Sequence, residues 1–349
     1  MAETRQGVKC CPTAGERGGG AACGTARRLQ ALGMTSPTRA EIETAARRIA
    51  PHIRRTPVLR MDGADLGLAI PLILKLELLQ ASGSFKPRGA FNTMLSAAAA
   101  GGLPPAGVAT ASGGNHGAAV AYAARALGLR AEVFCPVATP AAKTARIESY
   151  GAVLHKTGAM YDEARIASEA RAAETGALIV HAYDQPEVLA GQGTVALELE
   201  EDAPEATHVL VATGGGGLIG GIAGWYAGRG VQVISVEPES CPTLHTALRE
   251  GRPVPCPVGG LAADSLGARQ VGAHMFAVAR HHVAKTVLVT DEAIRAAQRR
   301  LWSALHLVAE PGGAAALAAL TSGAFVPPPG ARVAVILCGS NTDPANVTG

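Results

Sequence analysis

Strand-like and helix-like segments alternate along most of this 349-residue chain, and this alternation constrains its fold more than any other feature. Short runs rich in Val, Ile and Leu are separated by alanine-rich runs with helical spacing. The predicted strands are residues 72–78, 108–110, 131–134, 152–155, 178–181, 209–212, 231–236, 286–289 and 333–337. Such alternation is typical of α/β proteins, because each helix returns the chain to the start of the next parallel strand. We therefore predict an α/β fold with parallel strands, divided between two sheets.

The N-terminal segment has a different character. Residues 1–33 are rich in glycine, hold three of the seven cysteines and lack the continuous apolar run of a signal peptide. We expect a disordered tail here, or a true first residue at Met34. Thr38 and Glu41 then match a capping box, which predicts a helix over residues 39–50.

Composition excludes several classes of partner. The net charge is only +3, and no basic run with interleaved aromatic residues occurs, so nucleic acid is not expected. No apolar stretch reaches the roughly 18 residues that a membrane-spanning helix needs. The four cysteines beyond residue 33 are scattered, which favours the reducing cytoplasm.

Ligands of open α/β sheets bind beyond the carboxyl ends of strands, so the loops at these ends are the candidate sites. The first such loop is SGSFKPRGAFN, residues 82–92, which contains Lys86. An ammonium group that is desolvated near a helix N-terminus has a lowered pKa, and the neutral amine is a nucleophile. A solvated surface lysine is the commoner reason for a lone lysine in a loop.

Two glycine-rich loops follow later strands. In ASGGNHG, residues 111–117, free N–H groups at a helix start suit an anion such as a carboxylate, although a simple capped turn fits as well. In ATGGGGLIGG, residues 212–221, four consecutive glycines suit a phosphate. Gly215, Gly217 and Gly220 also satisfy G-x-G-x-x-G, with Glu237 at the end of the next strand. That weak match leaves a dinucleotide site open.

The last loop is LCGSNTD, residues 337–343, in which Cys338 is predicted to point into the same crevice. A buried structural thiol is the alternative. Nearby, Glu310 precedes an alanine-rich helix, where a carboxylate also complements the helix dipole.

Together these loops resemble those of one enzyme family. The matching segments, in the family's order, are SGSFKPRGAFN, ASGGNHGAAVAYAA, DQPEVLAGQGTVALELE, TGGGGLIGGIAG, VEPE, AEPGGAAALAAL and LCGSNTD. They resemble the serine/threonine dehydratase and serine racemase family, whose members are fold-type II enzymes that use pyridoxal 5′-phosphate (PLP). The resemblance extends over residues 35–349. It implies two α/β domains with PLP in the cleft between them.

The resemblance also implies roles for individual residues. Lys86 would be the lysine that forms the Schiff base with PLP, Phe85 would flank the cofactor ring, and Asn115 would bond its 3′-oxygen. Cys338 would face the pyridine nitrogen and leave it largely unprotonated, which favours β-elimination. The substrate carboxylate would be held at Ser112, Gly113, Asn115 and His116, and the cofactor phosphate at Gly214, Gly215, Gly216 and Gly217.

The implied reaction is the β-elimination of L-threonine or L-serine. Lys86 would remove the Cα proton, the β-hydroxyl would leave, and hydrolysis of the released aminoacrylate would yield ammonia with 2-oxobutanoate or pyruvate. Alternatives are a dehydratase of another hydroxyamino acid such as 3-hydroxyaspartate, a β-replacement enzyme, a serine racemase and, in a different class, an NAD-linked dehydrogenase.

Two positions depart from the family's pattern. Racemases carry a serine where this chain has Gly113, so elimination with little racemisation is expected. Glu237 resembles a cation ligand of the racemases, but a second carboxylate is expected six residues later, where Thr243 stands; we therefore expect no metal. For the architecture we expect a large PLP-binding domain from residues 34–106 and 185–349, a small domain from 107–184, and a homodimer.

Overall fold

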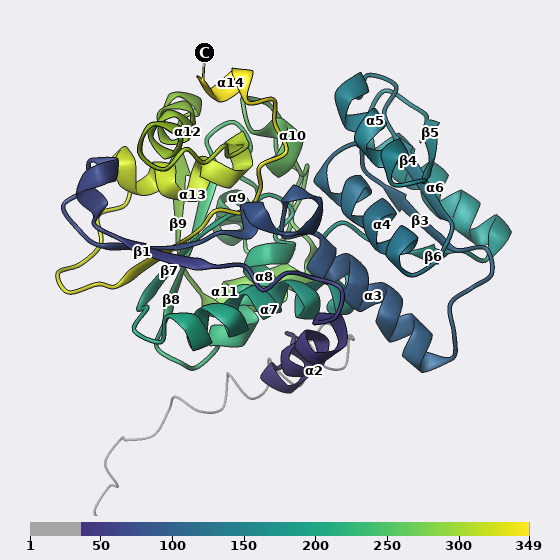
Figure 1. Cartoon of the computed structure of the whole chain (residues 1–349), viewed down its shortest axis with the longest axis horizontal. Helices are drawn as coiled ribbons and strands as arrows, with labels where there is room; N and C mark the ends of the chain where they lie inside the picture. The colour runs from purple at the N-terminus through teal and green to yellow at the C-terminus, as the bar shows by residue number, and fades with distance from the viewer. Residues whose placement is uncertain (1–35, 349) are drawn as a thin grey trace, which may run out of the picture. The chain divides into compact units, whose positions relative to one another are not determined.

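The computed structural model describes residues 36–348, which belong to one compact unit (Figure 1). The predicted tail at residues 1–33 lies outside the described residues. Two sheets organise this unit, and most connections between neighbouring strands run through helices. The α/β prediction with two sheets is therefore confirmed.

The larger sheet has six strands in the order β1-β2-β10-β7-β8-β9. All neighbouring pairs are parallel except β1 and β2, which are antiparallel. The sequence did not predict β1, a short edge strand. The bounds are Val58–Met61 for β1, Leu72–Lys75 for β2, His208–Ala212 for β7, Gln232–Pro238 for β8, Val283–Val289 for β9 and Val333–Ile336 for β10.

The smaller sheet has four parallel strands in the order β5-β4-β3-β6. In Figure 1 it lies with α4, α5 and α6, apart from the larger sheet. The bounds are Val108–Ala111 for β3, Ala131–Cys135 for β4, Val153–Lys156 for β5 and Leu178–Ile179 for β6. Each of these strands was predicted within a few residues.

Helices cover both sheets, and short 3₁₀ turns join some of the elements. The predicted capping box at Thr38 is present at the start of α2, where the Thr38 hydroxyl and the Glu41 carboxylate bond each other's backbone N–H groups. The α-helices are Arg39–Ile49 (α2), Pro87–Ala100 (α3), Asn115–Ala126 (α4), Ala141–Ser149 (α5), Tyr161–Thr175 (α6), Pro186–Asp202 (α7), Gly217–Tyr226 (α8), Thr243–Glu250 (α9), Ala263–Leu266 (α10), Ala273–His282 (α11), Asp291–Leu305 (α12), Pro311–Thr321 (α13) and Ala345–Thr348 (α14). The 3₁₀ turns are Gly63–Leu66 (η1), Glu77–Leu79 (η2) and Ala81–Gly83 (η3).

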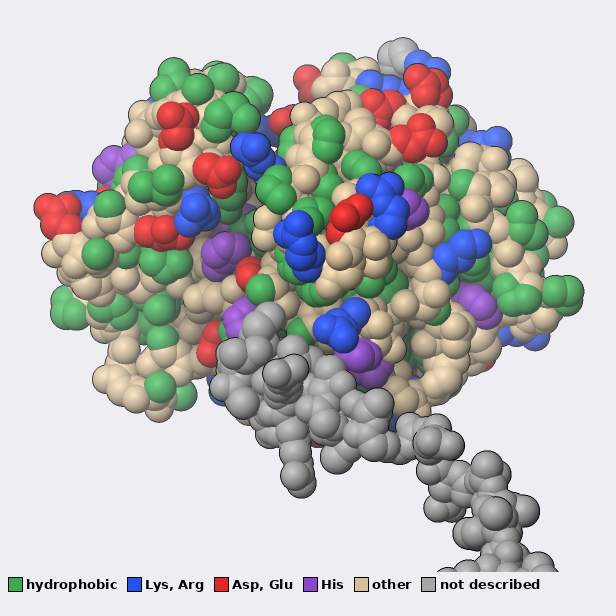
Figure 2. Space-filling model, turned by 180° about the vertical axis from the view of Figure 1, so that it is seen from behind, with side chains coloured by type: hydrophobic (Ala, Val, Ile, Leu, Met, Phe, Trp, Pro, Cys, Tyr) green, Lys and Arg blue, Asp and Glu red, His purple; other side chains and the backbone are tan. Residues whose placement is uncertain are grey.

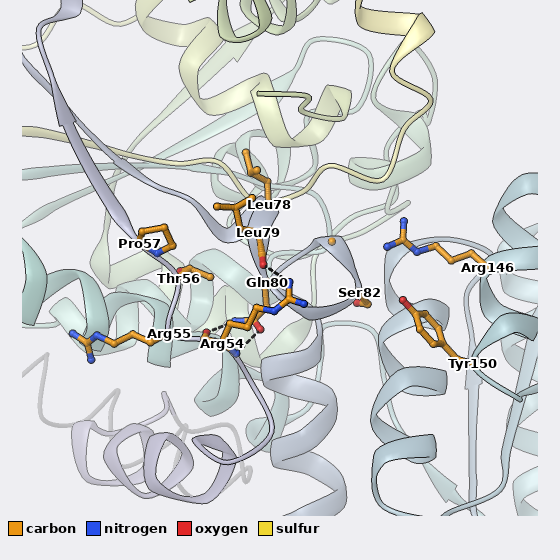
Figure 3. Close-up of a pocket in the computed structure, with 11 residues that line it drawn as sticks. Arg54, Arg55, Thr56, Pro57, Leu78, Leu79, Gln80, Ser82, Arg146 and Tyr150 are labelled. Carbon is orange, nitrogen blue, oxygen red and sulfur yellow. Dashed lines mark hydrogen bonds between the residues drawn. The ribbon is translucent and has the colours of Figure 1, made fainter. Parts of the chain in front are cut away.

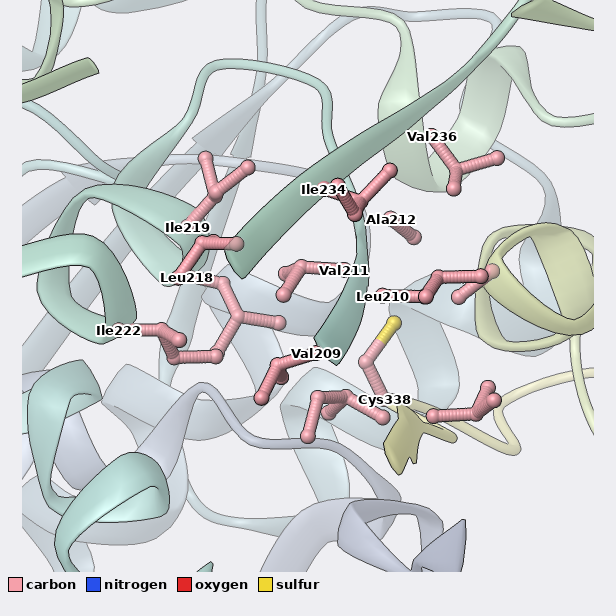
Figure 4. Packing of buried hydrophobic residues seen from close by; sticks show 14 of the residues in the cluster. Val209, Leu210, Val211, Ala212, Leu218, Ile219, Ile222, Ile234, Val236 and Cys338 are labelled. Atoms are coloured by element: carbon pink, nitrogen blue, oxygen red, sulfur yellow. The ribbon is translucent and has the colours of Figure 1, made fainter. Parts of the chain in front are cut away.

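The main hydrophobic core lies on the larger sheet. Figure 4 shows aliphatic side chains of β7 and β8 packed against Leu218, Ile219 and Ile222 of α8. Every residue of α8 is buried, so this helix is held on all sides. Its start, where the glycine-rich loop lies, is therefore fixed by the packing of the whole helix.

Helices α7 and α8 approach each other through glycines. A Cβ atom on Gly221 would lie 2.4 Å from the Leu189 carbonyl oxygen, and one on Gly193 would lie 3.0 Å from the Gly221 carbonyl oxygen. Side chains larger than hydrogen would push the helices apart. The glycines therefore set the distance between these two buried helices.

A buried ionic network joins β2, η2, α3 and α7. Arg88 donates to Glu77 at 2.7 and 2.8 Å and to Glu198 at 2.7 and 2.9 Å. Lys75 donates to Glu198 at 2.7 Å. The side chains of Arg88, Glu77 and Lys75 are completely buried. Burial opposes the charge on Glu198, but Arg88 and Lys75 hold its pKa below the ordinary value.

The surface carries charges of both signs. On the face seen in Figure 2, Lys and Arg side chains are interspersed with acidic and apolar ones. Among the described helices, none combines the length and apolarity needed to span a membrane.

Candidate active site

Lys86 lies at the start of α3, immediately before Pro87 at the first helical position. Its Nζ donates a hydrogen bond to the Ala182 carbonyl at 2.7 Å and lies 5.1 Å from the centre of the Phe85 ring. Desolvation lowers the pKa of Lys86 to about 8, although the nearby Cys338 and Glu310 oppose this shift. A much larger fraction of this amine than of an ordinary lysine is therefore neutral and nucleophilic near neutral pH.

The loop before α4 and the first turn of that helix present backbone N–H groups to the cavity that Lys86 also lines. The Ser112 hydroxyl accepts a hydrogen bond from the Gly114 N–H at 3.2 Å, and α4 begins at Asn115. The first N–H groups of a helix have no partner within the helix and attract anions. This arrangement fits the predicted carboxylate site. A Cβ atom on Gly113 would lie 2.5 Å from the Thr139 methyl carbon, so Thr139 fills the space beside this glycine.

His116 and Asn115 have side-chain partners within the protein. The His116 Nε2–H donates to the Val180 carbonyl at 2.9 Å, and burial lowers the pKa of His116 to about 3, so the ring is neutral. Asn115 donates to Glu310 at 2.5 Å and accepts from Asn341 at 2.6 Å. What these two residues offer most directly to an anion is therefore their backbone N–H groups. Their predicted side-chain roles stay predictions.

The four glycines Gly214–Gly217 connect β7 to α8. Gly216 has a φ of 92°, a conformation that L side chains rarely adopt. A Cβ atom on Gly215 would lie 2.4 Å from the Tyr183 ring, and one on Gly216 would lie 2.1 Å from the Met275 methyl carbon. The loop is thus a cradle of bare backbone at a helix N-terminus, as a bound phosphate requires.

Cys338 and Glu310 lie close to Lys86 but are less accessible. The Cys338 thiol is buried next to the Gly312 carbonyl, at 3.4 Å, and burial raises its pKa far above the ordinary value. It is therefore a neutral group, as the predicted partner of a pyridine nitrogen should be. Burial also raises the pKa of Glu310 to about 7, while the hydrogen bond from Asn115 opposes the shift.

One cavity of about 350 Å³ brings these loops together. Lys86, the loop before α4 and Gly215 contribute to its wall. Phe85 and Cys338 lie near Lys86 but do not line the cavity, and neither do the other three glycines of the Gly214–Gly217 loop. Sequence reasoning missed the larger part of the wall, because no local motif marks it. That part comprises Pro136, Ala138, Thr139, Pro140, Lys143, Tyr161, Ala182, Tyr183, Ala263, Asp264, Ser265, Gly267 and Ala268.

A larger and more open hollow lies elsewhere, near the start of β1. Figure 3 shows Gln80 bonded to the backbone of Arg54 on one side, with Arg146 and Tyr150 of the smaller-sheet region on the other. Its volume is about 580 Å³. It includes neither Lys86 nor the two glycine-rich loops, so size does not identify the site of chemistry here.

The dinucleotide alternative fails on the geometry of Glu237. This carboxylate is fully buried and accepts hydrogen bonds from the Leu244 and His245 N–H groups, at 2.6 and 2.8 Å, at the start of α9. It is used to cap a helix and does not reach out to a ribose. Among the described residues, no cluster of three or more His, Cys, Asp or Glu side chains is suited to a metal ion.

Comparison with known proteins agrees with this site. Residues 49–339 match the model of a family described as pyridoxal-phosphate dependent enzyme. The chain belongs to this family. PLP is therefore its cofactor, and the NAD-linked alternative is wrong. The family match contains the first three of the loops that the sequence had singled out and extends into the fourth, as far as residue 339.

Individual relatives of this PLP enzyme act on hydroxyamino acids or isomerise them, according to their names. It is 38% identical to an L-threonine ammonia-lyase of Geobacter sulfurreducens over 86% of this chain and 75% of the relative. It is 37% identical to a phenylserine dehydratase of Ralstonia pickettii over 89% and 95%. The solved structure of maize serine racemase superposes with a TM-score of 0.83 at 31% identity, covering 90% of this chain and 96% of the other. The resemblance inferred from the motifs is confirmed.

The residues present fit PLP. The Lys86 amine opens into the cavity, the glycine cradle would be filled by any added Cβ, and the Cys338 thiol is neutral. We therefore expect Gly214–Gly217 to hold the phosphate and Lys86 to hold the aldehyde carbon.

Gly216→Ala should weaken PLP binding by about tenfold or more, because an alanine at this positive φ is strained and its methyl group collides with Met275. Fluorescence titration of the cofactor-free protein with PLP measures this change. Gly228→Ala is the matched control, because Gly228 also has a positive φ, of 73°, but has open space around it. Equal losses in both variants would mean that backbone strain alone, and not the cradle, determines the affinity.

Proposed function

We propose that this PLP enzyme dehydrates and deaminates L-threonine, L-serine or both, and releases 2-oxobutanoate or pyruvate with ammonia. The observation that carries the proposal is the placement of the Lys86 amine in the wall of one cavity with the N–H groups that begin α4. A substrate carboxylate held at those N–H groups leaves its Cα within reach of the amine. The names of the threonine ammonia-lyase and phenylserine dehydratase relatives support the same reaction class.

The protein's own groups account for the proton transfers and the orientation of the substrate. PLP supplies, when bound, an electron sink for the charge left on Cα. The Lys86 amine, with its lowered pKa, takes the Cα proton, and the β-hydroxyl takes up a proton as it leaves, so that one proton and the hydroxyl are released together as water. The N–H groups of Gly113, Asn115 and His116 would fix the carboxylate, since the Ser112 N–H already bonds the Phe134 carbonyl and the Gly114 N–H the Ser112 hydroxyl. The neutral Cys338 thiol places no positive charge at the ring nitrogen, which favours loss of the β-hydroxyl over transfer of the amino group.

Serine racemisation is the alternative that a solved relative brings forward. Racemisation requires a proton donor on the face opposite Lys86, and Gly113 has no side chain to provide one. The Thr139 side chain, methyl and hydroxyl alike, occupies the space beside Gly113. The missing side chain at Gly113 is what supports elimination with little racemisation. Enzymes that dehydrate 3-hydroxyaspartate or catalyse β-replacement would hold the substrate carboxylate and amine in the same way. They would differ in the part of the cavity that receives the β-substituent.

The experiment that tests the function measures two products from the purified holoenzyme. We expect 2-oxobutanoate from L-threonine and pyruvate from L-serine, detected by hydrazone formation, and little D-serine, detected by chiral chromatography. Release of either 2-oxo acid at a turnover number above that of free PLP supports the proposal. D-Serine as the main product from L-serine would replace it by a racemase.

Three further features are proposed on the same basis. The two sheets would be the cores of two domains, a large one from residues 34–106 and 185–349 and a small one from 107–184, with the cavity between them. The location would be the cytoplasm, which the scattered free cysteines favour. The assembly would be a homodimer, which analytical ultracentrifugation tests directly.

A further inference from the structure

An ion pair lies at the rim of the cavity. Lys143, in α5, donates to Asp264, in α10, with an Nζ–Oδ2 distance of 2.6 Å. The two residues come from opposite walls, since α5 belongs to the region of the smaller sheet and α10 follows a strand of the larger one. Both side chains line the cavity that contains Lys86. The pair is therefore placed to contact the part of a bound substrate that lies farthest from Lys86.

The far end of the substrate is its β-substituent. The proposed function places the substrate carboxylate at the start of α4 and its amine at the Lys86 side of the cavity. The walls that remain for the β-substituent are the segments 136–143 and 263–268, together with the uncharged Tyr161, Ala182 and Tyr183. Most of their members that line the cavity are small or apolar, and the charged ones are Lys143 and Asp264. Selection among hydroxyamino acids must therefore depend largely on these two charges.

The charges cancel within the pair. Among the described residues that line this cavity, Lys86, Lys143 and Asp264 are the ones that carry charge, because His116 is neutral. Lys86 is committed to the cofactor, so Lys143 is the cation available to a second carboxylate. The Lys143 ammonium is already paired with the Asp264 carboxylate, at 2.6 Å. A carboxylate on the β-carbon would have to displace Asp264 and would meet its negative charge.

We propose that Asp264 is a specificity-determining residue, which masks Lys143 and so excludes hydroxyamino acids with an acidic side chain. The favoured substrates are then those whose β-substituent is hydrogen or an uncharged group, as in serine, threonine or an aryl-substituted serine. This inference rests on the proposed function and refines its substrate class. It also sets aside the 3-hydroxyaspartate alternative for the unmodified chain.

Asp264→Asn is the decisive variant, because it removes the charge and keeps the shape. The side chain of Asp264 is 71% exposed, so solvent screens part of the repulsion and the exchange should not unfold the protein. We expect the ratio of kcat/KM for threo-3-hydroxyaspartate to kcat/KM for L-threonine to rise by about tenfold. Asp65→Asn, on the exposed η1 turn, is the matched control and should leave the ratio unchanged.

The source of the gain is tested by a second substitution. Adding Lys143→Met to Asp264→Asn should return the ratio to the unmodified value or below it, because the freed cation is then absent. An unchanged ratio in Asp264→Asn, or a gain that persists after Lys143→Met, would overturn the inference. If the unmodified enzyme releases no 2-oxo acid from threonine or serine, the proposed function itself fails, which is a different result.

Inhibition gives a readout that does not depend on turnover of the acidic substrate. Succinate and butyrate have the same number of carbons and differ by one carboxylate. In competition with L-threonine, Asp264→Asn should lower the inhibition constant of succinate by about tenfold relative to that of butyrate. A parallel change for both acids would show that Asp264 acts on the shape of the cavity and not on charge, and would contradict the inference.

Discussion

Lys86→Ala should abolish the release of 2-oxo acid, with a fall in kcat of at least roughly 1,000-fold, because the group that moves the Cα proton is lost. The variant should also lose its covalent link to PLP. Borohydride reduction followed by mass spectrometry of the intact chain measures this, since it traps the cofactor on Lys86 in the unmodified enzyme only. Denaturation by urea should show that the fold is retained, because the side chain adds little to the core.

The matched control is Lys156→Ala. Lys156 is an exposed lysine at the end of β5 and lies outside the cavity. It should keep both the activity and the borohydride-trapped cofactor. Trapped cofactor on Lys86→Ala, in amounts equal to the unmodified chain, would assign the reactive amine to another lysine, and Lys143 in the same cavity would be the first to examine.

Arg88→Met should lower the free energy of unfolding by about 3–5 kcal/mol, because Glu77 and Glu198 are left buried with their shared cation removed. Methionine keeps most of the volume, so the loss reports on charge more than on packing. The shift of the urea midpoint measures it. Arg55→Met is the matched control: Arg55 also bonds two carboxylates, at 2.8 and 2.6 Å, but its side chain is 51% exposed, and exposed pairs contribute about 0–1 kcal/mol.

The deficit of Arg88→Met should depend on pH in a defined direction. In the unmodified chain the pKa of Glu198 is lowered, so this carboxylate contributes stability that is present above its ordinary pKa and lost as the pH falls below it. In the variant the carboxylates can take up protons instead. The difference between variant and unmodified chain should therefore be largest at neutral pH and narrow toward pH 5. A pH-independent deficit would attribute the loss to packing.

Local sequence signals predicted most of the fold. The capping box at Thr38 fixed the start of α2, because its two hydrogen bonds involve residues only three positions apart. The strand predicted at residues 72–78 is shorter in the structure: β2 ends at Lys75, and Glu77–Leu79 form a 3₁₀ turn. Leu76 and Leu78 are buried there as they would be in a strand, so alternation alone could not distinguish the two.

The site was predictable where the chemistry is local and not where it depends on tertiary contacts. The glycine-rich loops and Lys86 are recognisable because each motif is continuous in the sequence. The His116 ring donates a hydrogen bond to the carbonyl of Val180, the residue after β6. No sequence pattern predicts this contact, because it depends on how the fold places the two segments. Lys143 and Asp264 meet only because α5 and α10 are brought together by the fold.

The close contact of α7 and α8 limits which residues of this enzyme can be substituted. Because Gly193 and Gly221 leave no room between these two buried helices, larger residues cannot replace them without moving α8 and the glycine-rich loop at its start. The segment before α5, residues 136–140, lies largely exposed on the rim of the cavity and is not confined in this way. We therefore expect single substitutions on this rim to alter the proposed substrate range while the packing of α7 against α8 is preserved.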